Sequence, residues 1–134
     1  MLSIIIPFRD KHFLLKKCLD SIKSTQPKAE LELILINNNS TNKKTYKYLD
    51  ELNKNYLYKI QILKEKSDPF NYSEAINNGV KLAKYDNVLL LNNDVEIKTK
   101  YWAKILCQLL SNKSIGCIGS KLLNKNGSIQ HLGI

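Results

Sequence analysis

The chain has 134 residues, of which 43% are hydrophobic and 25% are charged, and its formal net charge is +9. This size supports one domain with one core, and no apolar run approaches the ~20 residues of a membrane-spanning helix. The charge favours anionic partners, but the lysines are dispersed, and no basic strand carries the interleaved aromatic residues that stack nucleic-acid bases. We therefore expect no nucleic-acid partner, and a basic surface that can make peripheral contact with an anionic membrane.

The amino-terminal part alternates apolar runs with helical patterns. Residues 2–7 form a short β-branched run that predicts a strand, and apolar residues recur at helical spacing over residues 11–24. Asp10 is a plausible N-cap for that helix. Residues 31–36 predict a second strand, and either Ser40 or Thr41 can cap the helix that follows it.

The middle of the chain continues the alternation. Residues 58–63 predict a third, outer strand, and residues 65–72 a loop, because Asp68-Pro69 breaks any helix. A helix follows Ser73, and its interior Gly79 suggests close packing, since glycine costs about 1 kcal/mol there relative to alanine. Residues 87–91 then predict a fourth strand that is buried on both faces.

The carboxyl-terminal part begins with a helix over residues 101–110, capped by Thr99. Residues 115–118 predict another strand, and residues 121–130 a hairpin that turns at Asn126-Gly127. Regular alternation of strands and helices predicts an α/β fold, which is a Rossmann-like, doubly wound, mostly parallel sheet with helices on both faces, ending in the hairpin.

The cysteines and the amino terminus bear on the compartment. The three cysteines are odd in number and lack paired metal spacing, and Cys18, Cys107 and Cys117 all fall on apolar patterns, so we expect reduced core residues. The first apolar run is too short for a signal peptide and has no basic residue before it. We therefore expect a cytoplasmic location, either free or at the inner face of the membrane.

Polar residues follow three of the predicted strands. They are Arg9 and Asp10 after the first strand, Asn37, Asn38 and Ser40 after the second, and Asn92, Asn93 and Asp94 after the fourth, and Pro7 ends the first strand at the same edge. Parallel strands place these ends at one edge, where open α/β sheets bind ligands. A guanidinium suits phosphate, amides suit a base or ribose, and a lone carboxylate suits a hydrated divalent cation completed by phosphate oxygens.

This set of residues predicts a nucleotide-diphosphate site, although Asn92 to Asp94 could also be a plain polar turn and Arg9, the only arginine, could be placed by chance. Neither the glycine-rich dinucleotide fingerprint nor a P-loop is present.

Six motifs carry a family resemblance. They are SIIIP at 3–7, LINNNST at 35–41, FNYS at 70–73 with INNG at 76–79, LLNND at 90–94, GSKLL at 119–123 and IQHLG at 129–133. In this order and spacing they resemble the amino-terminal, nucleotide-sugar-binding half of family 2 glycosyltransferases with the A-type fold, over essentially the whole chain.

The resemblance implies inverting transfer of a sugar from a UDP- or dTDP-sugar to a glycan or lipid-linked acceptor in cell-envelope polysaccharide synthesis, with Mg²⁺ or Mn²⁺. It assigns Asp94 to the metal, and Pro7, Arg9, Asn37, Asn38, Asn92 and Asn93 to the nucleotide. Asn71, Asn77 and His131 match positions on the donor-sugar side, although each also has a structural interpretation, and His131 can be a plain surface residue. Asn37 and Asn38 replace the family's acidic pair, which leaves the identity of the nucleotide base open, and Asn92 replaces the first acid of the family's metal-binding motif, which favours a modest metal affinity.

In the family the general base lies in the acceptor-binding half, beyond the segment that this chain matches. We therefore predict one donor-binding domain over residues 1–134 that lacks that half and transfers little alone. Apolar residues at its boundary, Ile115, Ile118, Leu122 and Leu132, are expected to promote self-association. A non-catalytic nucleotide-binding or assembly module is the alternative, and a nucleotidyltransferase is disfavoured because no glycine-rich basic loop follows the first strand.

Overall fold

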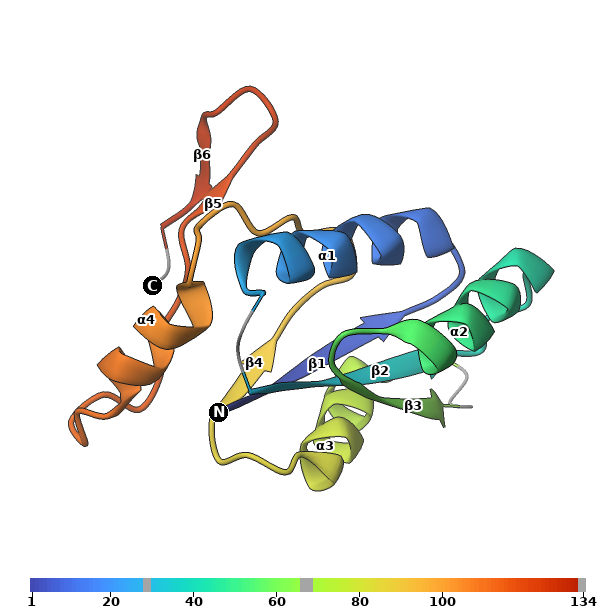
Figure 1. Cartoon of the computed structure of the whole chain (residues 1–134), viewed down its shortest axis with the longest axis horizontal. Helices are drawn as coiled ribbons and strands as arrows, with labels where there is room; N and C mark the ends of the chain where they lie inside the picture. The colour runs from blue at the N-terminus through green and yellow to red at the C-terminus, as the bar shows by residue number, and fades with distance from the viewer. Residues whose placement is uncertain (28–29, 66–68, 133–134) are drawn as a thin grey trace.

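The computed structural model describes residues 1–27, 30–65 and 69–132, which form one sheet with flanking helices and a separate hairpin (Figure 1). The elements are β1 (Leu2–Phe8), α1 (His12–Thr25), β2 (Leu31–Asn38), α2 (Lys43–Asn55), β3 (Lys59–Glu65), α3 (Tyr72–Leu82), β4 (Val88–Leu90), α4 (Trp102–Leu110), β5 (Leu122–Leu123) and β6 (Ile129–His131). The strand order is β3-β2-β1-β4 with every neighbouring pair parallel, and β5 pairs with β6 antiparallel. The predicted fold class is therefore confirmed.

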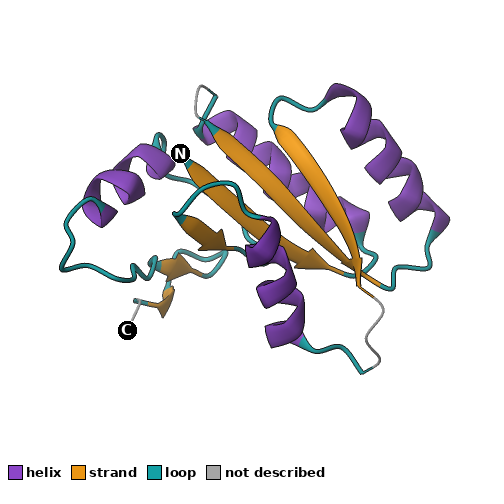
Figure 2. Ribbon diagram, turned by 90° about the horizontal axis from the view of Figure 1, so that it is seen from below, coloured by secondary structure: helices purple, strands orange, loops and turns teal. Residues whose placement is uncertain are grey.

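Helices cover both faces of the sheet, with α1 and α2 on one face and α3 on the other (Figure 2). Successive side chains of a strand point to opposite faces, and β1 shows this directly. Ile4 and Ile6 pack in the larger apolar cluster with α1, α2 and α4, whereas Ile5 packs in the smaller cluster with Ala75 and Ile76 of α3. The continuous apolar run of β1 is thus explained by burial on both faces.

Gly79 allows α3 to approach the sheet closely. A Cβ atom at this position would lie 2.8 Å from Ile5 Cγ2 and 2.9 Å from Ile36 Cδ1, and both isoleucines are fully buried. The close packing that the sequence suggested for this interior glycine is confirmed.

The fourth strand and the segment after α4 differ from expectation. β4 is an outer strand in which Leu90 is 49% exposed, so the prediction of burial on both faces is wrong. Residues 115–118, all of them described, form no strand, and Cys117 is exposed rather than part of the core. Apolar residues favour a strand only where a neighbouring strand can take up the backbone hydrogen bonds, and sequence alone does not show whether that neighbour exists.

The predicted apolar boundary is only partly covered. Ile115, Ile118 and Leu122 are half-buried, and Leu132 is 63% exposed. Self-association through these residues stays a prediction. Residues 66–68 of the expected loop and Gly133 of the last motif lie outside the described residues.

The helices begin at residues other than those predicted. Asn42 caps α2 and Asn71 caps α3, through side-chain oxygens that accept from Lys44 N (2.9 Å) and Glu74 N (3.1 Å). Ser40, Thr41 and Thr99 are not caps, and the N-cap positions of α1 and α4 are Lys11 and Tyr101, both left-handed. Asp10 does not cap α1 because its carboxylate binds the segment after β2, as described below.

The predicted turn at Asn126-Gly127 is confirmed. Gly127 has φ +83°, a conformation that glycine adopts without steric cost. None of the described helices has the length and apolar character needed to cross a membrane.

Several ionisable groups are held neutral inside the fold, which predicts alkaline destabilisation. Burial raises the pKa of Cys18 from 9.0 to about 12, and it also raises the pKa values of Tyr48, Tyr56 and Tyr58 above 10.0. The unfolded chain releases these protons first, so stability is complete below pH 9 and falls above it, by about 1.4 kcal/mol per pH unit for each group fully held neutral.

Thermal unfolding followed by circular dichroism should show a melting temperature that is level from pH 7.0 to 8.5 and falls towards pH 10.5. Tyr56 donates its hydroxyl proton to Leu19 O at 2.7 Å. Tyr56→Phe should therefore lower the melting temperature at pH 7 and make the alkaline fall shallower. A melting temperature that stays constant to pH 10.5 would contradict the prediction.

Candidate functional site

The carboxyl edge of the sheet holds an open pocket of about 480 Å³. It is lined by Arg9, Asp10 and Lys11 from the loop after β1, by Leu14 of α1, and by Asn93 and Asp94 from the loop after β4. The structure thus brings Arg9 together with Asn93 and Asp94, although Asn93 lies 84 positions further along the chain. These residues meet because β1 and β4 are neighbouring parallel strands. Cationic and acidic groups share this pocket, which is the combination that a phosphate and its counter-cation require.

The two amides at the end of β2 belong to different faces of the sheet. Asn37 follows the alternation of Leu33 and Leu35 towards α1 and α2, and Asn38 follows Ile36 towards α3. Asn37 Oδ1 accepts from Ser40 N at 3.1 Å, so this side chain shapes the turn after β2.

Asn38 differs from Asn37 in having an acceptor without a partner. Its side chain is only 5% exposed, and Oδ1 has no hydrogen-bond partner among the described residues. A buried polar atom left in this state costs about 1–3 kcal/mol. Among the described residues, Asn38 is therefore the one at this edge with a buried side-chain oxygen that can still accept a hydrogen bond.

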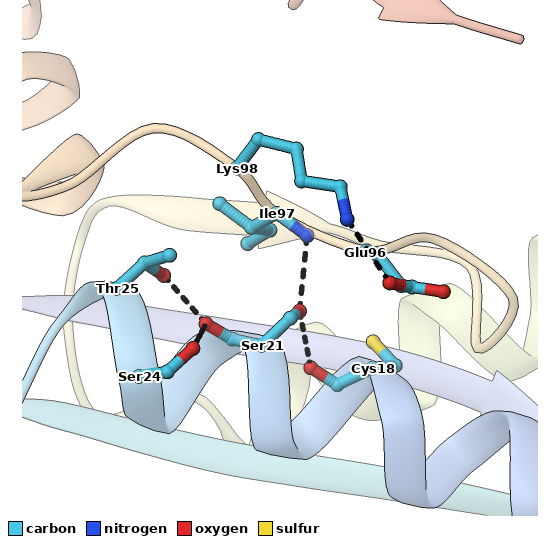
Figure 3. A network of polar contacts seen from close by, with 7 residues as sticks. All are labelled: Cys18, Ser21, Ser24, Thr25, Glu96, Ile97 and Lys98. Atoms are coloured by element: carbon cyan, nitrogen blue, oxygen red, sulfur yellow. Dashed lines mark hydrogen bonds and ion pairs between the residues drawn. The ribbon is translucent and has the colours of Figure 1, made fainter. Parts of the chain in front are cut away.

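The loop after β4 is anchored to α1 at two points on either side of Asp94. Cys18 Sγ lies 3.7 Å from Asn92 O. Ile97 N donates to Ser21 Oγ at 3.0 Å, as Figure 3 shows. Ser21 Oγ in turn donates to Cys18 O at 2.7 Å. Asp94 therefore extends from a loop held at both ends, and its carboxylate is exposed.

Two groups at the loop after β4, the Cys18 thiol and the Glu96 carboxyl, have shifted pKa values. Burial raises the pKa of Cys18 to about 12, and the negative charges of Asp94 and Glu96 add to the shift. The Lys98 ammonium, 3.1 Å from Glu96 Oε2, lowers the pKa of that carboxyl (Figure 3). Cys18 is therefore a neutral thiol near pH 7, and Glu96 is ionised.

The remaining predicted residues lie outside the pocket lining. Pro7 is buried within β1, and Asn92 is exposed with its carbonyl near Cys18. Asn71 caps α3, Asn77 is exposed on α3, and His131 is exposed on β6. Figures 1 and 2 both place the hairpin that carries His131 away from the ends of β1 and β2. The roles assigned to these residues stay predictions.

Lys11 was missed as a site residue, and Asp10 was expected at this edge but with a further role as the N-cap of α1. Both have left-handed backbones, with φ 44° and 49°, which brings them to the pocket beside Arg9. A helical pattern predicts only that residues 11–24 are helical, and a cap pattern suggests only that Asp10 binds its own helix. The actual partners of Asp10 are 31 and 32 positions away, so no local signal reveals them.

Comparison with known proteins adds sequence relatives. Residues 3–129 match the family model described as Glycosyl transferase family 2. The O-antigen biosynthesis protein RfbC of Myxococcus xanthus is 33% identical over 98% of this chain, and the uncharacterized protein y4gI of Sinorhizobium fredii is 31% identical over 100%. The chain spans only 10% and 14% of the lengths of these two relatives.

Solved structures share the fold. S. aureus TarS 1-349 in complex with UDP superposes with a TM-score of 0.69 at 14% identity, covering 95% of this chain and 43% of TarS. The mannosyltransferase PcManGT from Pyrobaculum calidifontis, in complex with GDP-Man and Mn²⁺, superposes with a TM-score of 0.70 at 16% identity, covering 92% and 35%. Since the family model matches nearly the whole chain, the protein belongs to glycosyl transferase family 2.

Proposed function

We propose that this chain is the donor-binding domain of an inverting glycosyltransferase and binds a UDP- or dTDP-sugar at the carboxyl edge of the sheet. The observation that carries the proposal is the pocket in which Arg9 and Lys11 stand with Asn93 and Asp94. Family membership and the nucleotide complexes of TarS and PcManGT support it.

The diphosphate would bind between the cations and the metal. The Arg9 guanidinium can hold a phosphate at two points, which an ammonium cannot do. The oxygens of Asp94 and Asn93 fit Mg²⁺ or Mn²⁺, which accept hard oxygen ligands. Over the described ranges no group of three or more His, Cys, Asp or Glu residues could hold a metal, so the ion would depend on Asp94 together with the phosphates of the donor. Such an ion, when bound, stabilises charge on the departing diphosphate.

The base would be recognised through Asn38. Its Oδ1, which has no partner among the described residues, suits an imino N–H such as that of uracil or thymine, because a donated hydrogen bond removes the cost of the buried acceptor. Asn37 has no such role in the proposal, since its oxygen is already bound to Ser40 N.

Transfer itself would need a general base from an acceptor-binding part of a longer protein. Glu96 is a poor candidate because it pairs with Lys98 and does not line the pocket. We expect the acceptor to be a glycan or a lipid-linked glycan, in keeping with the similarity to an O-antigen biosynthesis protein of Myxococcus xanthus. A non-catalytic nucleotide-binding module is the second candidate, favoured by the use of the Asn37 amide in a turn.

Calorimetric titration with UDP, dTDP and GDP, each with and without Mn²⁺, tests the proposal. We expect Mn²⁺-dependent binding of UDP or dTDP, and Arg9→Lys should weaken it by about tenfold because two-point contact with phosphate is lost. Lys47→Ala, an exposed lysine of α2 outside the pocket lining, is the matched control. A folded chain that binds none of the three nucleotides would refute the donor site, and sugar transfer by the 134-residue chain alone would refute its dependence on an acceptor half.

A further inference from the structure

We propose that Asp10 is a positioning residue that holds the loop carrying Arg9 and Lys11 against the segment after β2, and so keeps the donor pocket assembled. The inference rests on the proposed function, because it names what sets the geometry of that same pocket. The hydrogen bonds of Asp10 that carry the inference do not involve a metal ion.

Asp10 both accepts hydrogen bonds from the segment after β2 and donates one to it. Its Oδ1 accepts from Thr41 N at 3.0 Å and from Asn42 N at 2.9 Å, and the hydroxyls of Thr41 and Thr45 lie 3.4 and 3.5 Å from the carboxylate. In return, Asp10 N donates to Ser40 Oγ at 2.8 Å. The carboxylate thus takes up backbone N–H groups at the entry of α2, where the helix dipole favours negative charge.

The backbone of Asp10 and Lys11 has a conformation that needs stabilising contacts such as these. Asp10 and Lys11 are consecutive non-glycine residues with φ 49° and 44°, a conformation that L-residues rarely adopt and that persists only when surrounding contacts impose it. Arg9 precedes this pair and lines the pocket with it. A loop that relaxed to ordinary φ values would carry Arg9 and Lys11 away from Asp94.

Three substitutions separate positioning from stability. Asp10→Asn keeps an amide oxygen for Thr41 N and Asn42 N and tolerates the left-handed backbone. Asp10→Ala removes the acceptors and leaves the backbone strain. Asp10→Gly also removes the acceptors but relieves that strain.

We expect Asp10→Asn to bind UDP with Mn²⁺ within about threefold of the unmodified chain, and Asp10→Ala to bind at least about tenfold more weakly. Asp10→Gly should recover thermal stability relative to Asp10→Ala without recovering affinity. A residue that only stabilised the fold would show affinity and stability returning together. Thr25→Val is the control, because it removes the 3.1 Å bond from Trp102 Nε1 at the far end of α1 and should cost stability without loss of affinity.

Amide resonances of the nucleotide-free chain give a second, independent test. Asp10→Ala should shift the N–H signals of Lys11, Thr41, Asn42 and Asn93. In Asp10→Asn, the N–H signals of Lys11 and Asn93 should lie close to their positions in the unmodified chain. If the unmodified chain bound no nucleotide, the proposed function would fail while these shifts still decided the role of Asp10. Unchanged Lys11 and Asn93 signals in Asp10→Ala, or UDP affinity equal to that of the unmodified chain, would overturn the proposal.

Discussion

Asp94→Ala is expected to remove the Mn²⁺-dependent part of UDP binding, lowering affinity in the presence of Mn²⁺ by roughly 10- to 100-fold. Asp94 is the carboxylate that the loop after β4 contributes to the pocket beside Asn93, and over the described ranges no group of three or more His, Cys, Asp or Glu residues could hold the ion without it. Removal of the carboxylate leaves Arg9 and Lys11 in place, so metal-free affinity should change by less than about threefold.

The measurement is calorimetric titration of both proteins with UDP at several Mn²⁺ concentrations. Asp86→Ala is a matched control, because it removes an exposed carboxylate from the α3–β4 connection, outside the pocket lining. The Asp94 side chain is exposed, so the melting temperature should stay that of the unmodified chain. Persistence of the full Mn²⁺ effect in Asp94→Ala would assign the ion to other ligands.

Gly79→Val is expected to have the largest effect on stability, with a loss of about 3 kcal/mol from overpacking alone. A Cβ atom at this position would meet Ile5 and Ile36 below 3.0 Å, and both isoleucines are fully buried, so the helix or these core side chains must shift to accommodate it. Gly79→Ala should cost less, since the gain of about 1 kcal/mol in helix propensity offsets part of the clash.

Thermal unfolding by circular dichroism checks this, with a fall of about 3 °C or more in melting temperature per kcal/mol. Gly116→Ala is the control, since a Cβ there meets nothing within 4 Å. The atom of Ile36 that clashes with the added Cβ is Cδ1, which Ile36→Val removes. The double variant Gly79→Ala with Ile36→Val should therefore be more stable than the sum of the two single changes predicts. A Gly79→Val chain as stable as the unmodified one would show that α3 can move away from the sheet.

The candidate site was only partly accessible from the sequence. That Arg9 and Asp94 would share one edge followed from strand alternation alone, because parallel strands end together. The sequence did not show that Asn37 is used in a turn while Asn38 has an oxygen with no partner among the described residues, since the two are identical amides in adjacent positions. Lys11 entered the pocket through a left-handed backbone that no propensity predicts.

The sequence by itself determined the features that depend on local patterns. Apolar periodicity determined the order of strands and helices, and Asn126-Gly127 determined the hairpin, because neighbouring residues decide the spacing of buried faces and the sign of φ in a tight turn. Only the tertiary structure decided that β4 lies at the outer edge, that residues 115–118 form no strand, and that Asp10 serves α2 rather than α1. Each of these depends on which distant backbone groups are near enough to accept or donate a hydrogen bond, and that is settled only when the chain is folded.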